Sequence, residues 1–186
     1  LDVSPLTGRH VSLEPLAPDH VDALAAAGSG DRSTFGYTQV PDGRTETAAY
    51  VEWLLDDAAH DRAAPFAQRR IIDGAVVGCT RFLNPAWPLG RADPDEVEIG
   101  GTWLSSSAQR TPINTEAKLL LLTHAFDVWN VQRVAICTDA RNEQSRLAIE
   151  RLGATFEGVM RRHRRSTRFG EDATLRDTAT YSITID

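Results

Sequence analysis

The sequence lacks the residue groupings that mark metal-binding and disulfide-bonded proteins. Its 186 residues include two cysteines, Cys79 and Cys137, and neither has a partner at a metal or redox spacing. The five histidines are scattered, without an HxH or HExxH pattern. We therefore expect no metal site, and we interpret both cysteines as small buried residues of a reducing cytoplasm.

Long hydrophobic runs are also absent from the sequence. The densest, over residues 119–122, ends at Thr123 and His124, well short of the roughly 18 residues that a membrane-spanning helix needs. The first ten residues, LDVSPLTGRH, lack the basic and apolar parts of a secretory signal. We expect a cytoplasmic protein that has no membrane partner.

The charge of the chain is acidic. Lysine and arginine total 20 against 26 for aspartate and glutamate, a net charge of −6. Such a surface disfavours nucleic-acid binding and mildly favours cationic partners such as amines. The basic run RRHRRSTR over residues 161–168 is interpreted as a solvated hairpin with one face near the substrate cleft, more readily than as a nucleic-acid site. The acidic cluster DPDEVE over residues 93–98 either attracts a cationic amine or is solvated surface.

Hydrophobic periodicity predicts a single domain over residues 1–186, without an internal repeat. Strands are expected at 9–16, 65–72, 75–83, 97–104, 131–139, 155–163 and 173–185, with a turn containing FGED before the last. Helices are expected at 21–27, at 113–129, at 142–153 and after a cap at Thr45 or Thr47. The strand and helix order in the second half predicts a mixed α/β sheet with helices on both faces.

The loop before the helix expected at 113–129 has the features of an anion site. It lies in the stretch SSSAQRTPINTEAKLLLLTHAF, residues 105–126. The first N–H groups of a helix have no partner within the helix, so the backbone of 109–115 would present N–H groups to a phosphate. Arg110 adds a positive charge, and Lys118 lies one turn further on. The alternative is an ordinary turn capped by Asn114 or Thr115.

The helix expected at 142–153 has a serine on its apolar face. Ser145, Ala148, Ile149 and Leu152 share one side by their i, i+3, i+4, i+7 spacing. We expect that side to face the sheet, which would place the Ser145 hydroxyl at the edge of the core. The alternative is a serine that bonds to its own helix.

Several segments together form a recognisable pattern: LTGRHVSLEPLAPDHVDAL, VEIGGTWL, QRTPINTEAKLLLLTHAF, RVAICTDARNEQSRLAIERLGATFEGVMRRHRR and RDTATYSI. The pattern resembles the GNAT acetyltransferases, in the branch similar to the ribosomal-protein N-terminal acetyltransferases, and it covers nearly the whole chain. The resemblance implies a splayed, seven-stranded mixed sheet that binds acetyl-CoA. It also implies transfer of an acetyl group to a primary amine.

The resemblance further implies a pyrophosphate loop, usually Q/R-x-x-G-x-G/A. Here that frame is Gln109-Arg110-Thr111-Pro112-Ile113-Asn114. Pro112 replaces a glycine and therefore removes one N–H donor, while Arg110, at a position that is also commonly glycine, can offset the loss by pairing with a phosphate. The implied cofactor-binding residues are Trp103, Leu104, Gln109, Arg110, Thr111, Asn114 and Thr115, with Asn142 on the pantetheine arm.

The catalytic roles are likewise implied by the resemblance. A protonated amine must lose a proton, and Glu98 is the first candidate for the base; its alternative is pairing with an arginine or facing solvent. Glu116 is the second candidate, with stabilisation of the helix dipole as its alternative. The N–H of Leu104 would stabilise the oxyanion. Ser145 would hydrogen-bond to the departing thiolate, while Tyr181 is expected to pack in the core.

The acceptor is the least determined part of this interpretation. It is a peptide or protein N-terminus or a small-molecule amine, and the acyl group could be longer than acetyl. The alternative is a degenerate scaffold that binds CoA or another protein with little catalysis. Trp87, on a long loop, is a candidate wall of the substrate pocket. The family resemblance also suggests a homodimer as a partner arrangement.

Overall fold

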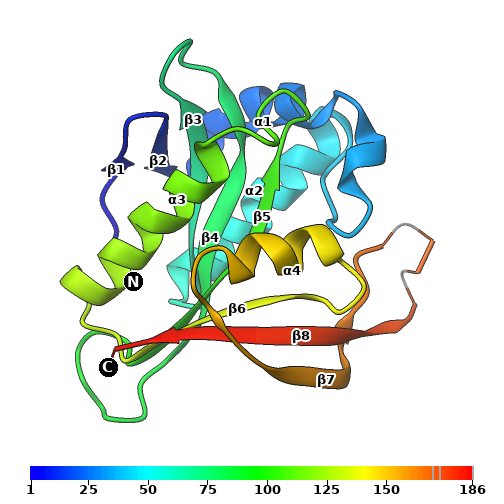
Figure 1. The fold of residues 1–186 in the computed structure, drawn as a ribbon. Helices are drawn as coiled ribbons and strands as arrows, with labels where there is room; N and C mark the ends of the chain where they lie inside the picture. Colours follow the sequence, from blue (N-terminus) through cyan, green and yellow to red (C-terminus); the bar gives the residue numbers. More distant parts are fainter. Residues whose placement is uncertain (169, 172, 186) are drawn as a thin grey trace.

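One mixed sheet with helices on both faces forms the protein (Figure 1). The computed structural model describes residues 1–168, 170–171 and 173–185. The strands are β1 (Leu6–Thr7), β2 (Val11–Pro15), β3 (Ala63–Arg70), β4 (Val76–Ala86), β5 (Glu96–Leu104), β6 (Arg133–Asp139), β7 (Thr155–Arg165) and β8 (Leu175–Thr184). Their order in the sheet is β1-β2-β3-β4-β5-β6-β8-β7. The mixed α/β prediction is confirmed, although the sheet has eight strands and not seven, because the short β1 adds an edge.

The helices divide between the two faces of the sheet. They are α1 (Val21–Gly28), α2 (Gly43–Ala59), α3 (Ile113–Thr123) and α4 (Glu143–Glu150), with short helical segments at Pro18–His20, Arg32–Phe35 and His124–Val128. Helices α3 and α4 lie on one face and α1 and α2 on the other (Figure 1). Each face has its own hydrophobic cluster, around Ile99 and Leu121 on the first and around Leu24 and Leu54 on the second.

The centre of the sheet opens between β5 and β6. These strands are the parallel pair, and their pairing runs only from Glu96 opposite Arg133 to Glu98 opposite Ala135. Beyond that point β5 continues to Leu104 and β6 continues to Asp139 without pairing to each other. Unpaired strand ends expose backbone groups that seek a partner, so the separation predicts a binding site there.

The start of α2 differs from the sequence prediction. The helix begins at Gly43 after Asp42, and not at a cap on Thr45 or Thr47. The Thr47 hydroxyl instead donates to the carbonyl of Gly43 at 2.8 Å, one turn back within the helix. The N–H of Asp42 is satisfied by the carboxylate of Glu46 at 2.9 Å. The acidic residue one turn in therefore does the capping that we had assigned to a threonine.

Other element boundaries differ by a few residues. The helix expected at 113–129 is α-helical to Thr123 and continues as a π-helical turn over His124–Val128. Strand β4 runs three residues beyond its expected end, to Ala86. The predicted helix at 142–153 is confirmed as α4, and Gly153 follows it with a φ of 85°. Phe169 and Asp172 of the expected FGED turn lie outside the described residues.

Candidate active site

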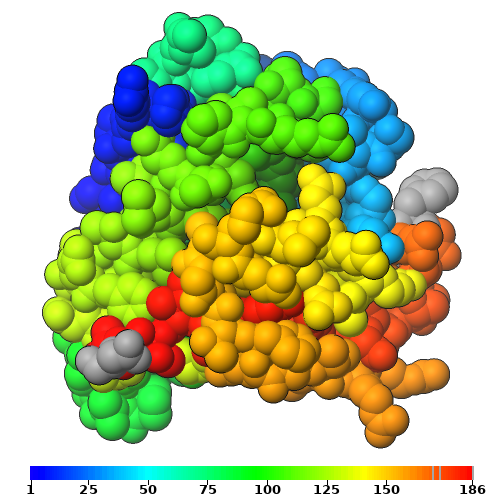
Figure 2. Space-filling model, viewed as in Figure 1, coloured from blue at the N-terminus to red at the C-terminus, as the bar shows by residue number. Residues whose placement is uncertain are grey.

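A cavity of about 1230 Å³ lies where β5 and β6 separate. Its walls come from the segment of residues 33–41, α2, β4, β5, the start of α3, β6, the start of α4, β7 and β8. Figure 2 shows a recess between the green loop before α3 and the yellow helix α4, with the blue 33–41 segment beside it. The fold thus brings three stretches that are distant in sequence to one opening.

Most of the predicted site residues line this cavity. They are Glu98, Trp103, Leu104, Gln109, Arg110, Asn114, Asn142 and Ser145. Thr111 and Thr115 are not among the lining residues. The Thr111 hydroxyl donates to the carbonyl of Ala108 at 2.6 Å and so stabilises the turn before α3, and Thr115 is exposed. The binding role of these two residues stays a prediction.

The loop before α3 leaves its N–H groups available. In the described part of the chain, the N–H groups of Arg110, Thr111, Asn114 and Thr115 make no hydrogen bond. Arg110 has a φ of 58°, a left-handed conformation that favours glycine, which explains why glycine suits this position. Pro112 has ordinary helical angles and directly precedes Ile113, the first residue of α3. The geometry is that of an anion site at a helix N-terminus.

The start of α4 faces the loop from the other side of the cavity. The Asn142 side-chain oxygen accepts from the N–H of Ser145 at 3.1 Å and caps the helix. Since the oxygen is used, the Asn142 amide nitrogen remains available as a donor. Ser145 is half-buried and lines the cavity, as its place on the apolar face predicted.

Glu98 is held by two side chains and is 5% exposed. Its two carboxylate oxygens accept from Arg164 at 2.8 and 2.7 Å, and one also accepts from Asn84 at 2.9 Å. The pairing with an arginine, which the sequence left as the alternative, is therefore present. A carboxylate offers about four acceptor positions, so three donors leave one for a water or substrate proton.

Glu116 is a structural residue and does not line the cavity. Its carboxylate accepts from the backbone N–H groups of Arg9, His10 and Val11 at 2.8, 2.6 and 2.9 Å, which ties α3 to the start of β2. Burial by itself raises the pKa of Glu116, but these hydrogen bonds outweigh it and hold the pKa below the ordinary value of 4.5. An ionised acceptor of three amides is unsuited to act as a base.

Replacing Glu116 by alanine should lower the free energy of unfolding by about 2 kcal/mol at pH 7, because three amides lose a shared charged acceptor. Because the native pKa is depressed, this contribution is complete above pH 4.5 and is lost as the pH falls through the native pKa. Urea denaturation at pH 7 and pH 3 would measure the loss and its decrease in acid. Glu52→Ala, an exposed change on α2, is the control, and equal stability of the two variants at pH 7 would contradict the role.

Lys118 lies deeper than expected. It is 6% exposed, and its Nζ donates to the hydroxyls of Thr102 at 2.5 Å and Thr80 at 3.4 Å. In the described residues no carboxylate pairs with it. Burial alone lowers the pKa of Lys118 to about 7. The side chain is therefore directed to the β4–β5 strands, and not to the phosphate loop as the sequence suggested.

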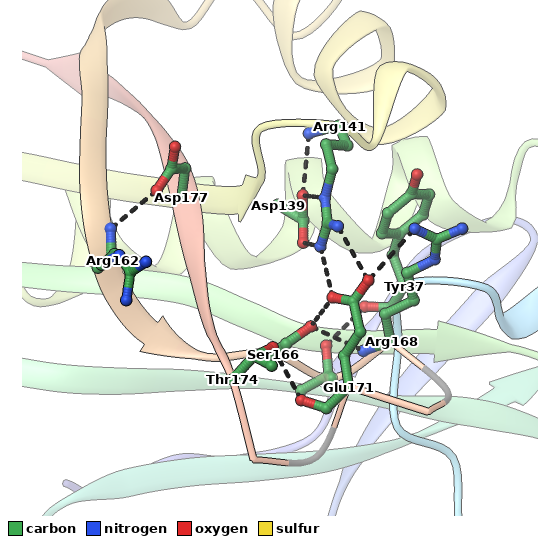
Figure 3. Close-up of polar contacts among 10 residues, drawn as sticks. Tyr37, Asp139, Arg141, Arg162, Ser166, Arg168, Glu171, Thr174 and Asp177 are labelled. Atoms are coloured by element: carbon green, nitrogen blue, oxygen red, sulfur yellow. Dashed lines mark hydrogen bonds and ion pairs between the residues drawn. The ribbon is translucent and has the colours of Figure 1, made fainter.

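A polar cluster at the rim ties the β7–β8 connection to the cavity (Figure 3). Arg141, just after β6, pairs with Asp139 and with Glu171, with shortest distances of 2.8 and 2.9 Å. Ser166 also donates to Glu171, and the Thr167 hydroxyl donates to the carbonyl of Tyr37 at 2.7 Å. The pKa of Glu171 is held at about 2, chiefly by Arg141 and then by Ser166. These contacts hold the hairpin against the 33–41 segment.

The structure also places Tyr181, Trp87 and the acidic cluster at 93–98, for which expectations came from the sequence. Tyr181 is fully buried between Arg146 and Glu150, as expected of a packing residue. Trp87 is not among the lining residues of this cavity, so it does not form one of its walls. The acidic cluster at 93–98 is largely neutralised: Asp95 pairs with Arg91, and Glu96 pairs with Arg133.

The cavity also contains residues that the sequence did not indicate. They include Tyr37, Tyr50, Arg81 and Arg176. One available signal was the alternation in β8, where Arg176, Thr178, Thr180 and Ser182 place polar side chains on one face. In the described part of the chain, no cluster of three or more metal-ligating side chains was found, and no helix is long and apolar enough to cross a membrane.

Comparisons with known proteins agree with this geometry. A family model described as "Acetyltransferase (GNAT) domain" matches residues 10–155. YdaF of Bacillus subtilis (strain 168), whose name marks it as a candidate ribosomal N-acetyltransferase, is 39% identical over 91 residues. Those residues are 49% of this chain and 46% of that protein. The match therefore spans about half the length of the curated relative.

Solved structures extend the likeness to the whole chain. The crystal structure of a GCN5-related N-acetyltransferase from Brucella melitensis is similar with a TM-score of 0.83 and 30% identity, covering 99% of this chain and 80% of that one. The microcin C7 self immunity acetyltransferase MccE, solved with acetyl-CoA and AMP, has a TM-score of 0.79 at 20% identity, covering 99% of this chain and all of that one. The latter likeness shows the fold alone. Because the family model spans most of its residues, the chain belongs to the GNAT family of acetyltransferases.

Proposed function

We propose that residues 1–186 form one acetyl-CoA-dependent N-acetyltransferase domain that acts on a primary amine. The observation that carries the proposal is the cavity itself. It has unpaired N–H groups at the start of α3 on one side and the buried carboxylate of Glu98 on the other. Family membership and the acetyl-CoA complex of MccE support the choice of cofactor. The name of the Bacillus subtilis relative supports an amine on a protein as one acceptor.

The loop before α3 would hold the diphosphate of the cofactor. The N–H groups of Arg110, Thr111, Asn114 and Thr115 are the donors, and the positive end of the α3 dipole favours an anion there. The Arg110 side chain adds a charge that can pair with phosphate. Asn142, across the cavity, would donate its side-chain N–H to the pantetheine arm.

Acetyl-CoA supplies a thioester that a neutral amine can attack. An alkylammonium has a pKa of about 10, so the acceptor must lose a proton first. Glu98 has one acceptor position left after Arg164 and Asn84, and it would take that proton through a bound water. The N–H of Leu104 would stabilise the developing oxyanion, and the Ser145 hydroxyl would donate to the leaving thiolate.

A thermal shift measurement tests cofactor binding. Acetyl-CoA at about one hundred times its dissociation constant should stabilise the chain by about 2.7 kcal/mol. CoA without the acetyl group should stabilise it similarly, because the diphosphate contacts are shared. The absence of any shift at millimolar cofactor would indicate a scaffold that has lost the site.

Replacing Pro112 by glycine should tighten acetyl-CoA binding about tenfold, because it restores one N–H donor to a charged acceptor. The angles of Pro112 are accessible to glycine, so the loop need not change shape. Isothermal titration of wild type and variant would measure the change. Pro88→Gly, in an exposed loop away from the cavity, controls for general loosening of the chain, and an unchanged affinity of the Pro112 variant would contradict a role for the missing donor.

A further inference from the structure

The cavity reverses the charge of the rest of the protein. The whole chain carries a net charge of −6. The basic residues that line the cavity are Arg81, Arg110, Lys118, Arg141, Arg164 and Arg176, and the acidic ones are Glu46, Glu98 and Glu143. A basic cavity in an acidic protein concentrates anionic ligands. The phosphate groups of a cofactor account for Arg110, beside the loop, but not for the arginines elsewhere.

Two arginines lie side by side on the face of the sheet that carries Glu98. Arg164 of β7 is directly opposite Arg176 of β8 in the antiparallel register, so both side chains project from the same face. Glu98 reaches the same face and is bound by Arg164 through both oxygens. Two cations and one anion are thus gathered there, and one positive charge has no carboxylate.

Arg176 is the cation without a partner. Within the described residues its guanidinium makes no hydrogen bond and no ion pair, and its Nε is buried without a partner. Burial and the neighbouring Arg164 lower the pKa of Arg176, although Asp139 opposes the effect. Asp139 is itself bound by Arg141 through both oxygens. An unpaired guanidinium in a cavity wall is costly to bury. This cost points to an anionic ligand that pairs with the Arg176 guanidinium.

Arg81, on the β4 side of the same face, is a second guanidinium that pairs with no carboxylate of residues 1–168, 170–171 and 173–185. It lies over the ring of Trp53, 5.0 Å from the ring centroid. A Cβ added at Gly101, where β5 has a φ of 56°, would lie 2.6 Å from the Arg81 Cζ. Arg81 is also opposite Gly100 in the β4–β5 register. It therefore covers the strand that runs between Glu98 and Leu104, where the proposed chemistry occurs.

We propose that the acceptor is an amine that carries a carboxylate a few bonds from the reacting nitrogen, and that Arg176, with Arg81, binds that carboxylate. This inference rests on the proposed function. The loop before α3 and Asn142 serve the cofactor on the α3–α4 face, whereas Glu98, Arg81 and Arg176 share the opposite face and remain for the acceptor. The carboxylate would be supplied either by an acidic residue near a peptide N-terminus or by a free amino acid.

Two matched pairs of acceptors test the inference. The first pair is a peptide that begins Ser-Asp and one that begins Ser-Asn; the second is free aspartate and free asparagine. We expect the acidic member of at least one pair to have about tenfold or higher kcat/KM, since a charged hydrogen bond distinguishes its partners by that order. The pair that responds identifies the source of the carboxylate. Equal kcat/KM within both pairs would overturn the inference while leaving acetyl transfer intact.

The Arg176→Gln variant locates the effect. It should reduce the preference for the acidic acceptor to near unity, chiefly through KM, whereas Arg161→Gln, an exposed arginine on the same hairpin, should leave the preference unchanged. An unaltered preference in Arg176→Gln would overturn the assignment. If wild type acetylates none of the acceptors, the proposed function loses its support. Equilibrium binding of the same pairs to the CoA-loaded protein then tests the inference by itself. Tighter binding of the acidic member supports the inference, and equal binding of both members overturns it.

Discussion

The Glu98→Gln variant should acetylate an amine with a kcat/KM at least about one hundredfold below that of wild type, the usual contribution of a positioned proton acceptor. Glutamine keeps the shape of the side chain but cannot take a proton, and it leaves the charge of Arg164 uncompensated in the cavity wall. The loss should be greatest near neutral pH, where the acceptor is protonated. It should diminish at pH 10, where the amine loses its proton to solvent.

The pH profile separates this role from a purely structural one. Glu96→Gln is the matched control, because Glu96 lies two residues earlier on β5 and pairs with Arg133 outside the cavity. We expect near wild-type turnover for it. A Glu98→Gln variant whose loss is the same at pH 7 and pH 10 would show that Glu98 only holds Arg164 in place, and that the proton leaves by another route.

The Lys118→Met variant should be more stable than wild type by about 5 kcal/mol at pH 6. At that pH lysine is protonated in both states, so folding carries the cost of burying a charge without a carboxylate. Above a native pKa of about 7 the folded protein releases the proton while the unfolded chain keeps it to about pH 10.5. Wild-type stability therefore rises over this range, and the advantage of methionine should decrease to near zero by pH 10.5.

Lys118 is the sole lysine of the chain, which allows a direct measurement. A carbon label at its Cε gives a single lysine resonance whose titration reports the native pKa, and denaturation at pH 6 and pH 10 gives the stability difference. Thr80 and Thr102 bond to each other at 2.8 Å, so they retain a partner when the amine is removed. A lysine that titrates near 10.5, or a variant less stable than wild type at pH 6, would contradict the account.

Local signals were sufficient for much of the fold. Period-two and helical spacings placed nearly all the strands and helices, and the loop before α3 was identified from its position between a strand and a helix. Strand β1 was missed because two residues carry no periodicity. The cap of α2 was misassigned because Glu46 satisfies the N–H of Asp42 from within the helix, a contact that a list of favoured capping residues does not reveal.

The site was less accessible to sequence reasoning, because long-range pairing decides it. Glu98 was chosen for its place on β5, but its arginine partner lies 66 residues later, and a pairing at that separation has no local signal. Glu116 was the second candidate for the base, but its carboxylate binds backbone N–H groups at the turn before β2. The unpaired state of Arg176 follows from the register of β7 and β8, which alternation alone does not fix.

The most direct test of the account is a crystal structure of the chain with acetyl-CoA. We predict that the diphosphate lies within hydrogen-bond distance of the N–H groups of residues 110–115, with the thioester in the gap between β5 and β6. Density for the diphosphate at another surface, with the start of α3 left without an anion, would contradict it.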